Sequence, residues 1–326
     1  MRLLIHIGKR LLYAVIVLLA VIVLNFLLLQ LAPGDTADVI ASEMGGATEE
    51  MLEQIRHVYG LDKSIPEQSW IYLKKVARGD LGYSFYFNAA VTDLILRRVP
   101  ATILLVVSSQ LLSVLLGTFL GVLASLRPNG VLSHVVTLSA LVFWAAPVFW
   151  SGIMILILFA SIIPLFPVSG MFEITKTGGA FAHILDIAHH LFLPMITLAL
   201  LYLALYSRLA RASMLEVMNS DYIRTARAKG MSEPVVIYRH ALRNAVLPVV
   251  TMVGLQMSRV FAGAVLVETV FNWPGLGRLA FDSILRRDAP TILGILFFST
   301  LIVIVMNILT DLSYRLIDPR IQSETK

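Results

Sequence analysis

Long, uninterrupted runs of apolar residues limit what this chain can fold into. A bilayer core about 30 Å thick is crossed by roughly 20 apolar residues in a helix. Six stretches reach this length: Leu11–Leu31, Ala101–Leu126, Val135–Ile162, Leu191–Leu209, Leu247–Val270 and Thr291–Leu312. The third is the least regular, because Pro147 lies within it. The sequence therefore predicts an all-α, polytopic membrane protein with six transmembrane helices.

The composition supports this class and excludes others. Apolar residues make up 58% of the chain and charged residues 14%, far from the balance of a soluble domain. The first apolar run follows Arg2, Lys9 and Arg10, as a signal peptide would, but it is longer than the usual 7–15 or so apolar residues of one. We expect it to be a retained helix. The absence of cysteine excludes disulfides and thiol chemistry.

The positions of lysine and arginine predict the orientation, since short cytoplasmic loops of membrane proteins are enriched in both. With the N-terminus inside, the cytoplasmic side holds Arg2, Lys9, Arg10, Arg127, Arg208, Arg211, Arg224, Arg227, Lys229, Arg239, Arg243, Arg315, Arg320 and Lys326. The short outer loops hold Lys176, Arg278, Arg286 and Arg287. Both termini are therefore expected to be cytoplasmic. Anionic lipid facing these loops accounts for the net charge of +5, so no nucleic-acid partner is expected.

The segment between the first two spans is too long for a simple connector. Helical spacing and stop signals predict one helix from Thr48 to Gly60 and another from Pro66 to Gly79. This predicts an outer helical cap, either a lid on the spans or a receptor for an outside partner. The expected divisions are 1–32 (first span), 33–99 (cap), 100–317 (five-helix core, with a cytoplasmic coupling region at 213–245) and 318–326 (tail).

A polar, cationic helix is predicted between the fourth and fifth spans, over Asp221–Gly230. Tyr222, Ile223 and Ala226 fall on one side of it, flanked by cations. Gly230 is expected to end it in a left-handed conformation. A narrow apolar strip between cations suits insertion into a groove of a partner protein. The alternative is a helix that lies among lipid headgroups.

In this region the chain resembles the membrane permease subunits of ATP-binding-cassette importers, within the dipeptide, oligopeptide and nickel group. Their cytoplasmic signature is Glu-Ala-Ala, three residues, Gly, nine residues, then Ile-x-Leu-Pro. At the matching positions Ala226, Gly230 and Leu242 agree, whereas Arg224, Thr225, His240 and Arg243 depart from it. These departures resemble the first-permease type of peptide systems, in which Thr-Ala-Arg-Ala-Lys-Gly is usual.

Further motifs in the same order strengthen the resemblance along nearly the whole chain. They are Leu31-Ala32-Pro33-Gly34-Asp35, Gly60-Leu61-Asp62, Gly79-Asp80-Leu81-Gly82, Val168-Ser169-Gly170, Phe271-Asn272-Trp273-Pro274-Gly275-Leu276-Gly277 and Asp318-Pro319-Arg320-Ile321. The resemblance implies the type I importer permease fold, in the inner membrane of a bacterial cell. It also implies half of a translocation path for dipeptides or oligopeptides, with nickel, glutathione or another small solute as alternative cargo.

The resemblance also implies partners and a source of energy. A second, similar permease, two ATPase subunits or domains, and an extracytoplasmic solute-binding protein are expected. No phosphate-binding Gly-x4-Gly-Lys-Ser/Thr motif occurs in the chain. ATP and magnesium are therefore expected on the partners, with no cofactor, metal or catalytic residue in this chain. The coupling residues implied are Asp221, Tyr222, Arg224, Ala226, Arg227 and Gly230.

A single charge near the middle of the fifth span, Arg259, predicts a path-lining stripe. A midplane arginine is costly unless it faces a cavity or a partner. Gln256, Arg259 and Gly263 share a helical face that mixes polar and small residues. The alternative is a structural hydrogen bond to a neighbouring helix. A secondary transporter would need buried carboxylates, and its candidates Glu268 and Asp311 lie near span ends.

Two other features have more ordinary interpretations. Phe271–Gly277 combines turn formers with aromatic residues, which predicts a re-entrant or interfacial turn. His189 and His190 beside Asp186 could suggest a metal site, but a structural role is favoured.

Overall fold

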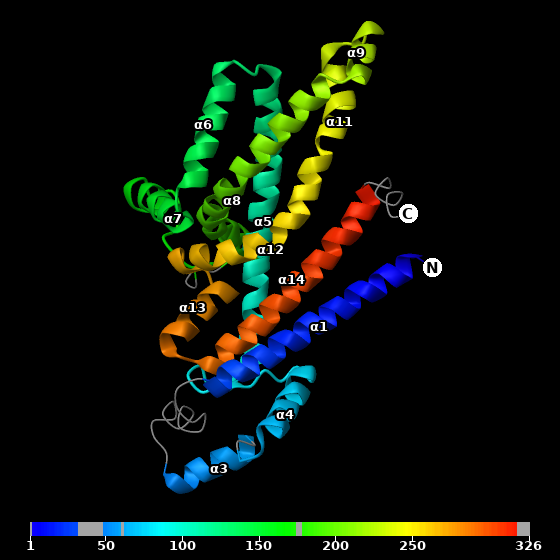
Figure 1. The fold of residues 1–326 in the computed structure, drawn as a ribbon. Helices are drawn as coiled ribbons and strands as arrows, with labels where there is room; N and C mark the ends of the chain where they lie inside the picture. Colours follow the sequence, from blue (N-terminus) through cyan, green and yellow to red (C-terminus); the bar gives the residue numbers. More distant parts are fainter. Residues whose placement is uncertain (1, 32–47, 60–61, 174–177, 318–326) are drawn as a thin grey trace. The chain divides into compact units, whose positions relative to one another are not determined.

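The computed structural model describes residues 2–31, 48–59, 62–173 and 178–317, apart from some side chains within these ranges, including those of Arg259 and Asp311. The predicted turn at Gly60, the Ala32–Asp35 motif and the 318–326 tail lie outside the described residues. The described part is almost entirely helical (Figure 1). Its elements are α1 Arg2–Leu31, α3 Glu49–Tyr59, α4 Ile65–Ala77, β1 Tyr83–Ser84, β2 Ala89–Ala90, α5 Val91–Leu126, α6 Val131–Ala145, α7 Val148–Leu156, the π-helical η1 Ile157–Ile162, α8 Ala180–Met218, α9 Asp221–Ala228, α10 Glu233–Val235, the π-helical η2 Val236–Ala241, α11 Leu242–Ala245, α12 Leu247–Val270, α13 Leu276–Arg286 and α14 Ala289–Ile317.

The chain forms two compact units. One joins residues 1–100 to 279–308, and the other joins 101–278 to 309–326. These two units are defined by which parts of the chain pack against one another. The predicted division into cap, core and tail concerns location relative to a membrane, and it stays a prediction.

In the first unit, α1 and α14 run side by side (Figure 1). The buried Asn25 amide of α1 donates to the backbone oxygen of Leu293 in α14, at 3.0 Å. Phe26 packs on Tyr72 of α4, with ring centroids 6.2 Å apart. Burial raises the pKa of the Tyr72 hydroxyl, and a hydrogen bond with Asn25 acts in the opposite direction. Polar side chains therefore hold the cap helix and the first and last long helices together.

The predicted cap helices are present as α3 and α4. Pro66 lies in the first turn of α4, and the backbone N–H of Ser64 donates to the Glu67 carboxylate at 3.3 Å. Gly79 takes the left-handed conformation, with φ of +80°, after the helix ends. The all-α prediction missed the short antiparallel pair β1–β2 that follows. Two residues a strand, closed by Asn88 at φ of +49°, are too short to produce an alternating pattern.

In the second unit, α5 and α8 approach closely because α5 presents two glycines four residues apart. A Cβ on Gly117 would lie 2.8 Å from Cβ of Tyr206, and one on Gly121 would lie 2.8 Å from Cβ of Ala210. Real Cβ atoms do not tolerate such contacts, so the close approach depends on both glycines. Small residues at this spacing are common where membrane helices pack. The core around them contains Leu105, Leu198, Tyr206, Val260 and Trp273.

Each predicted span coincides with helix, but the third and the fifth are bent. Three described helices are long and apolar enough to cross a membrane, α5, α8 and the Ala289–Ile308 part of α14, and the number rises to five if each bent pair is one span. The pairs are α6 with α7–η1, and Glu233–Gln256 with Val260–Val270. The first predicted span lies in α1, whose described apolar segment Leu12–Leu28 is shorter.

Pro147 explains the break in the third stretch. The residue before a proline is displaced from helical geometry, and Ala146 is extended there, with φ of −77° and ψ of 134°. The helices on either side consequently meet at 107°. The third predicted span, Val135–Ile162, is therefore a bent pair of helices rather than one straight helix.

Candidate functional site

The predicted cytoplasmic helix forms as α9, immediately after the long helix α8 (Figure 1). Asp221 lies in its first turn and Arg227 in its last, where both complement the helix dipole. Ile223 and Ala226 are buried, at 0% and 7% exposure. They pack in a small apolar cluster with Val122, Met214, Val236, Ala241 and Ala245. The helix is therefore held by its own chain.

This packing corrects the predicted use of the apolar strip. Ile223 and Ala226 were expected to enter a groove on a partner, but they already contact α5, α8 and η2 within the same chain. The other eight residues of Asp221–Gly230, including Tyr222, are exposed. Ala226 therefore holds α9 in place by packing against helices of the same chain. A partner protein would contact the exposed polar face of α9.

The predicted left-handed stop at Gly230 is confirmed, with φ of +77°. The Gly230 N–H donates to the Arg227 oxygen at 2.9 Å, and the Met231 N–H reaches the Ala226 oxygen at 3.4 Å. This pair of hydrogen bonds is the Schellman arrangement, which satisfies the last carbonyls of a helix. Among the described residues, apart from the two chain neighbours, no atom lies within 4 Å of a Cβ built on Gly230, so backbone geometry rather than space requires the glycine.

Polar contacts link the exposed face of α9 to the α10–α11 segment that follows it. Nε of Arg227 lies 2.7 Å from Oε1 of Glu233 in α10. Nδ2 of Asn244 donates to the Tyr222 hydroxyl at 2.9 Å. Arg224 contacts Asp221 at 3.5 Å, with 72% of its side chain exposed. Arg227 and Tyr222 thus have roles within the chain, whereas Arg224 is directed mainly to solvent.

The residues of the predicted path stripe on α12 are partly buried within the second unit. Gln256 is 7% exposed, and its Oε1 has no hydrogen-bond partner among the described residues. A Cβ on Gly263 would lie 3.3 Å from Leu198 and 3.5 Å from the Tyr202 hydroxyl, both on α8. The Arg259 side chain is outside the described part. The path assignment of these three residues stays a prediction.

Sequence reasoning missed the role of Glu268 at the end of α12. Its carboxylate is fully buried and accepts hydrogen bonds from the Thr102 hydroxyl at 2.6 Å, the Gly277 N–H at 2.7 Å and the Arg278 N–H at 3.1 Å. The Phe271–Gly277 turn wraps around it. A signal was present, because a carboxylate at the end of an apolar run needs buried partners. These partners also argue against a coupling-ion role for Glu268.

The Phe271–Gly277 turn folds inward. Trp273 is 0% exposed, and its Nε1 donates to the backbone oxygen of Ala101 at 2.8 Å. The Leu276 N–H donates to the Thr102 hydroxyl at 2.8 Å. The predicted turn is therefore present, with the Trp273 indole in the core of the unit, and its description as re-entrant or interfacial stays a prediction.

The two histidines beside Asp186 have partners within the chain. Nε2 of His189 lies 2.8 Å from the backbone oxygen of Leu165, and Nδ1 of His190 lies 2.9 Å from the backbone oxygen of Asp186. The buried Asp186 carboxylate accepts the Glu173 N–H at 2.7 Å. These contacts support the structural interpretation of the group.

Comparison with known proteins identifies the family. The model of the binding-protein-dependent transport system inner membrane component matches residues 114–323. The N-terminal model of the same kind of component matches residues 1–106. The chain belongs to this family. It is a membrane permease component of an ATP-binding-cassette importer, as the sequence resemblance implied, and family membership agrees with a transport role rather than a catalytic one.

Curated relatives of this permease align over nearly its full length. It is 38% identical to the di/tripeptide transport system permease protein DppB of Pseudomonas aeruginosa, over 98% of each chain. It is 36% identical to the oligopeptide transport system permease protein AppB of Bacillus subtilis, over 97% of this chain and 99% of that one. The dipeptide transport system permease protein DppB of Escherichia coli K12 is 37% identical, over 93% and 94%.

A solved structure supports the fold of the permease. A chain from the MetNI methionine ABC transporter in inward-facing conformations superposes with a TM-score of 0.55 at 16% identity. The alignment covers 69% of this chain and 96% of that chain. At this identity the likeness concerns the fold alone.

Proposed function

We propose that this permease forms half of the translocation path of an importer for dipeptides or oligopeptides. The observation that carries this is the 36–38% identity, over at least 93% of the chain, to relatives named as dipeptide, di/tripeptide and oligopeptide permeases. Nickel or glutathione is the alternative cargo within the same importer class.

We further propose six transmembrane helices of the type I importer arrangement, with both termini cytoplasmic. The distribution of arginine and lysine supports this orientation. The bent α6–α7–η1 and α12 segments each count as one span in this arrangement, and α1 supplies the sixth. The membrane is then the inner membrane of a bacterial cell.

Energy is proposed to enter through two ATPase subunits or domains that bind ATP and magnesium. A second permease would complete the path, and an extracytoplasmic solute-binding protein would deliver the cargo. The exposed polar face of α9, with Asp221, Tyr222, Arg224 and Arg227, is the proposed contact with the ATPase. Because Ile223 and Ala226 anchor α9 to α5, α8 and η2, movement of the ATPase would be transmitted directly into the helices.

Reconstitution tests the proposed function. The permease is purified with its second permease and ATPases, placed in proteoliposomes, and supplied with binding protein and radiolabelled di- or oligopeptide. ATP-dependent accumulation of peptide is the expected result. Accumulation of nickel or glutathione in place of peptide would assign the alternative cargo. Peptide uptake that persists without ATP and follows an ion gradient would overturn the importer assignment in favour of a secondary transporter.

A further inference from the structure

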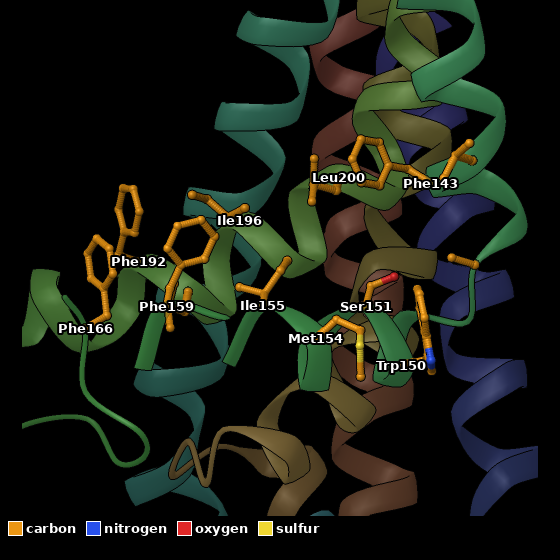
Figure 2. A pocket seen from close by; sticks show the side chains of 13 residues that line it. Phe143, Trp150, Ser151, Met154, Ile155, Phe159, Phe166, Phe192, Ile196 and Leu200 are labelled. Atoms are coloured by element: carbon orange, nitrogen blue, oxygen red, sulfur yellow. The ribbon is translucent and has the colours of Figure 1, made fainter. Parts of the chain in front are cut away.

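An apolar cavity lies between α6, α7, η1 and α8, wholly within the second unit (Figure 2). Its volume is about 510 Å³, within the range of roughly 300–1,000 Å³ of ligand pockets. Phe143 and Trp150 line one side, and Phe166 and Phe192 line the other. Among the described residues, no polar atom contributes to its accessible wall. An occupant of this cavity would have to be hydrocarbon.

A cation lies beyond one end of the cavity. Leu200 of α8 lines the cavity, and Ala204 follows one helical turn later. Nε of Arg208 donates to the Ala204 oxygen at 3.3 Å, so this side chain folds back along α8 toward Leu200. Its guanidinium carbon lies 5.4 Å from the ring centre of Trp144 on α6. The arginine is exposed, and no carboxylate of the described residues forms a salt bridge with it.

The apolar cavity and the Arg208–Trp144 pair match the change from hydrocarbon to polar headgroups across one bilayer leaflet. Tryptophan and arginine are typical of the boundary between headgroups and hydrocarbon. Arg211, one turn beyond Arg208, donates from Nε to the Ser133 hydroxyl at 3.0 Å and so continues the polar zone away from the cavity. The cavity lies on the opposite, apolar side of Arg208. A headgroup-level cation above a hydrocarbon-lined cavity has the chemistry of a phospholipid site.

We propose that the cavity and Arg208 together bind one anionic phospholipid of the membrane, with an acyl chain in the cavity and the phosphate on the guanidinium. The guanidinium supplies donors suited to phosphate oxygens. Trp144 covers one face of the guanidinium and limits its orientations. Placement in the cytoplasmic leaflet rests on the proposed topology, but binding itself does not depend on the cargo.

Two other occupants fit less well. A peptide would leave its backbone N–H and C=O groups unpaired against a wall without polar atoms, which is unfavourable. A transmembrane helix of a second permease could fill the apolar volume, but an ordinary apolar helix offers no anion for Arg208. Both occupants are distinguished by the experiment.

The test measures retained lipid. The permease complex is extracted in mild detergent from membranes of phosphatidylethanolamine and phosphatidylglycerol, and bound phosphatidylglycerol is counted by native mass spectrometry. Because a charge-assisted hydrogen bond is lost, Arg208→Gln should lower the bound fraction about fivefold or more. Arg208→Lys should be intermediate. Ser151→Phe, which fills the cavity from α7, should lower it similarly while leaving Arg208 in place.

A matched variant controls for general attraction of lipid to cations. Arg127 is also an exposed arginine, directly after the end of α5 at Leu126, and it does not line the cavity. Arg127→Gln should leave bound phosphatidylglycerol nearly unchanged. Equal lipid in wild type and Arg208→Gln would overturn the proposal, as would equal losses in Arg208→Gln and Arg127→Gln.

Cross-linking identifies the occupant. A photoreactive benzoylphenylalanine in place of Trp150, which lines the cavity, should form an adduct with phospholipid. An adduct with another protein chain or with a supplied peptide would overturn the lipid assignment. If Ser151→Phe fails to accumulate, the Arg208→Gln comparison and this cross-link decide the question without it.

Discussion

Two connecting segments within residues 101–278, the α9 region and the Phe271–Gly277 turn, have similar turn geometry but differ in how far they are buried. The α9 region and the Phe271–Gly277 turn both follow a long helix, and both contain left-handed residues, Gly230 at φ of +77° and Asn272 at φ of +54°. In the first, eight of ten residues from Asp221 to Gly230 are exposed. In the second, Phe271 and Trp273 are at most 2% exposed.

The difference lies in where the charged groups find partners. The Glu268 carboxylate accepts hydrogen bonds from the Thr102 hydroxyl and from the backbone N–H groups of Gly277 and Arg278, all within the same unit. On α9 the ion pairs of Arg224 and Arg227 are on the surface, where such pairs contribute little to stability. The polar groups of the Phe271–Gly277 turn are thus satisfied within the unit, whereas the charges of the α9 face are exposed and could contact another protein. Substitutions in the two regions should therefore separate effects on stability from effects on coupling.

The largest effect is expected from Glu268→Ala. It leaves the Thr102 hydroxyl and two backbone N–H groups buried without their acceptor, at a cost of about 1–3 kcal/mol each. We expect the protein to lose thermal stability by several kcal/mol in detergent, measured by scanning fluorimetry, or to fail to accumulate. Glu268→Gln keeps one acceptor oxygen and should lose less. Unchanged melting of the alanine variant would show that the carboxylate does not hold the turn.

Trp273→Ala should come next, at about 3–5 kcal/mol for the loss of a fully buried aromatic side chain. Trp273→Phe retains most of the apolar volume but removes the hydrogen bond to Ala101, which costs about 0.5–1.5 kcal/mol. Chemical denaturation of the purified permease measures both. Equal stability of the alanine and phenylalanine variants would contradict the burial of this indole.

Gly230→Val should cost about 1–3 kcal/mol of local backbone strain, because a β-branched residue is forced to positive φ. The effect should appear as a loss of substrate-stimulated ATP hydrolysis with normal insertion in the membrane. Gly230→Asn is the matched control, since asparagine tolerates the left-handed region and space is open around the Cβ position. Normal coupling in the valine variant would refute a role for this turn in docking.

Arg224→Glu should leave stability within about 0.5 kcal/mol, because this side chain is exposed. It should weaken retention of the ATPase subunits during purification, most clearly at low salt, where charge repulsion is least screened. Arg127→Glu, at another exposed arginine that lies outside the predicted coupling region 213–245, serves as control. If ATPase retention is normal and only affinity for anionic lipid falls, α9 lies among headgroups instead.

A similarly small effect is expected from the Arg227–Glu233 pair, with a coupling energy of about 0.2–1 kcal/mol. A double-mutant cycle with Arg227→Gln and Glu233→Gln measures the coupling energy in the thermal stability of the permease. A coupling energy near zero would show that the Schellman turn alone positions α9 against α10.

Several features follow from the sequence alone because they depend on local chemistry. The α12 helix has the predicted bounds of Leu247 and Val270, since an apolar run of that length satisfies its backbone hydrogen bonds only as a helix in a bilayer. The stop at Gly230 is also local, because left-handed geometry favours glycine whatever surrounds it. Pro147 likewise marked the third stretch as the least regular, although the sequence did not predict the 107° angle between its two helices.

The tertiary structure decided which faces are covered, because that depends on residues far apart in the chain. Ile223 and Ala226 form an apolar strip in any helix, but only packing against Val122, Met214 and Val236 turns the strip inward. Glu268 is a structural acceptor because Thr102, 166 residues away, reaches it. The cavity below Arg208 exists because the break at Pro147 directs α7 away from the axis of α6. Periodicity along a sequence predicts helices, whereas burial depends on which of them meet.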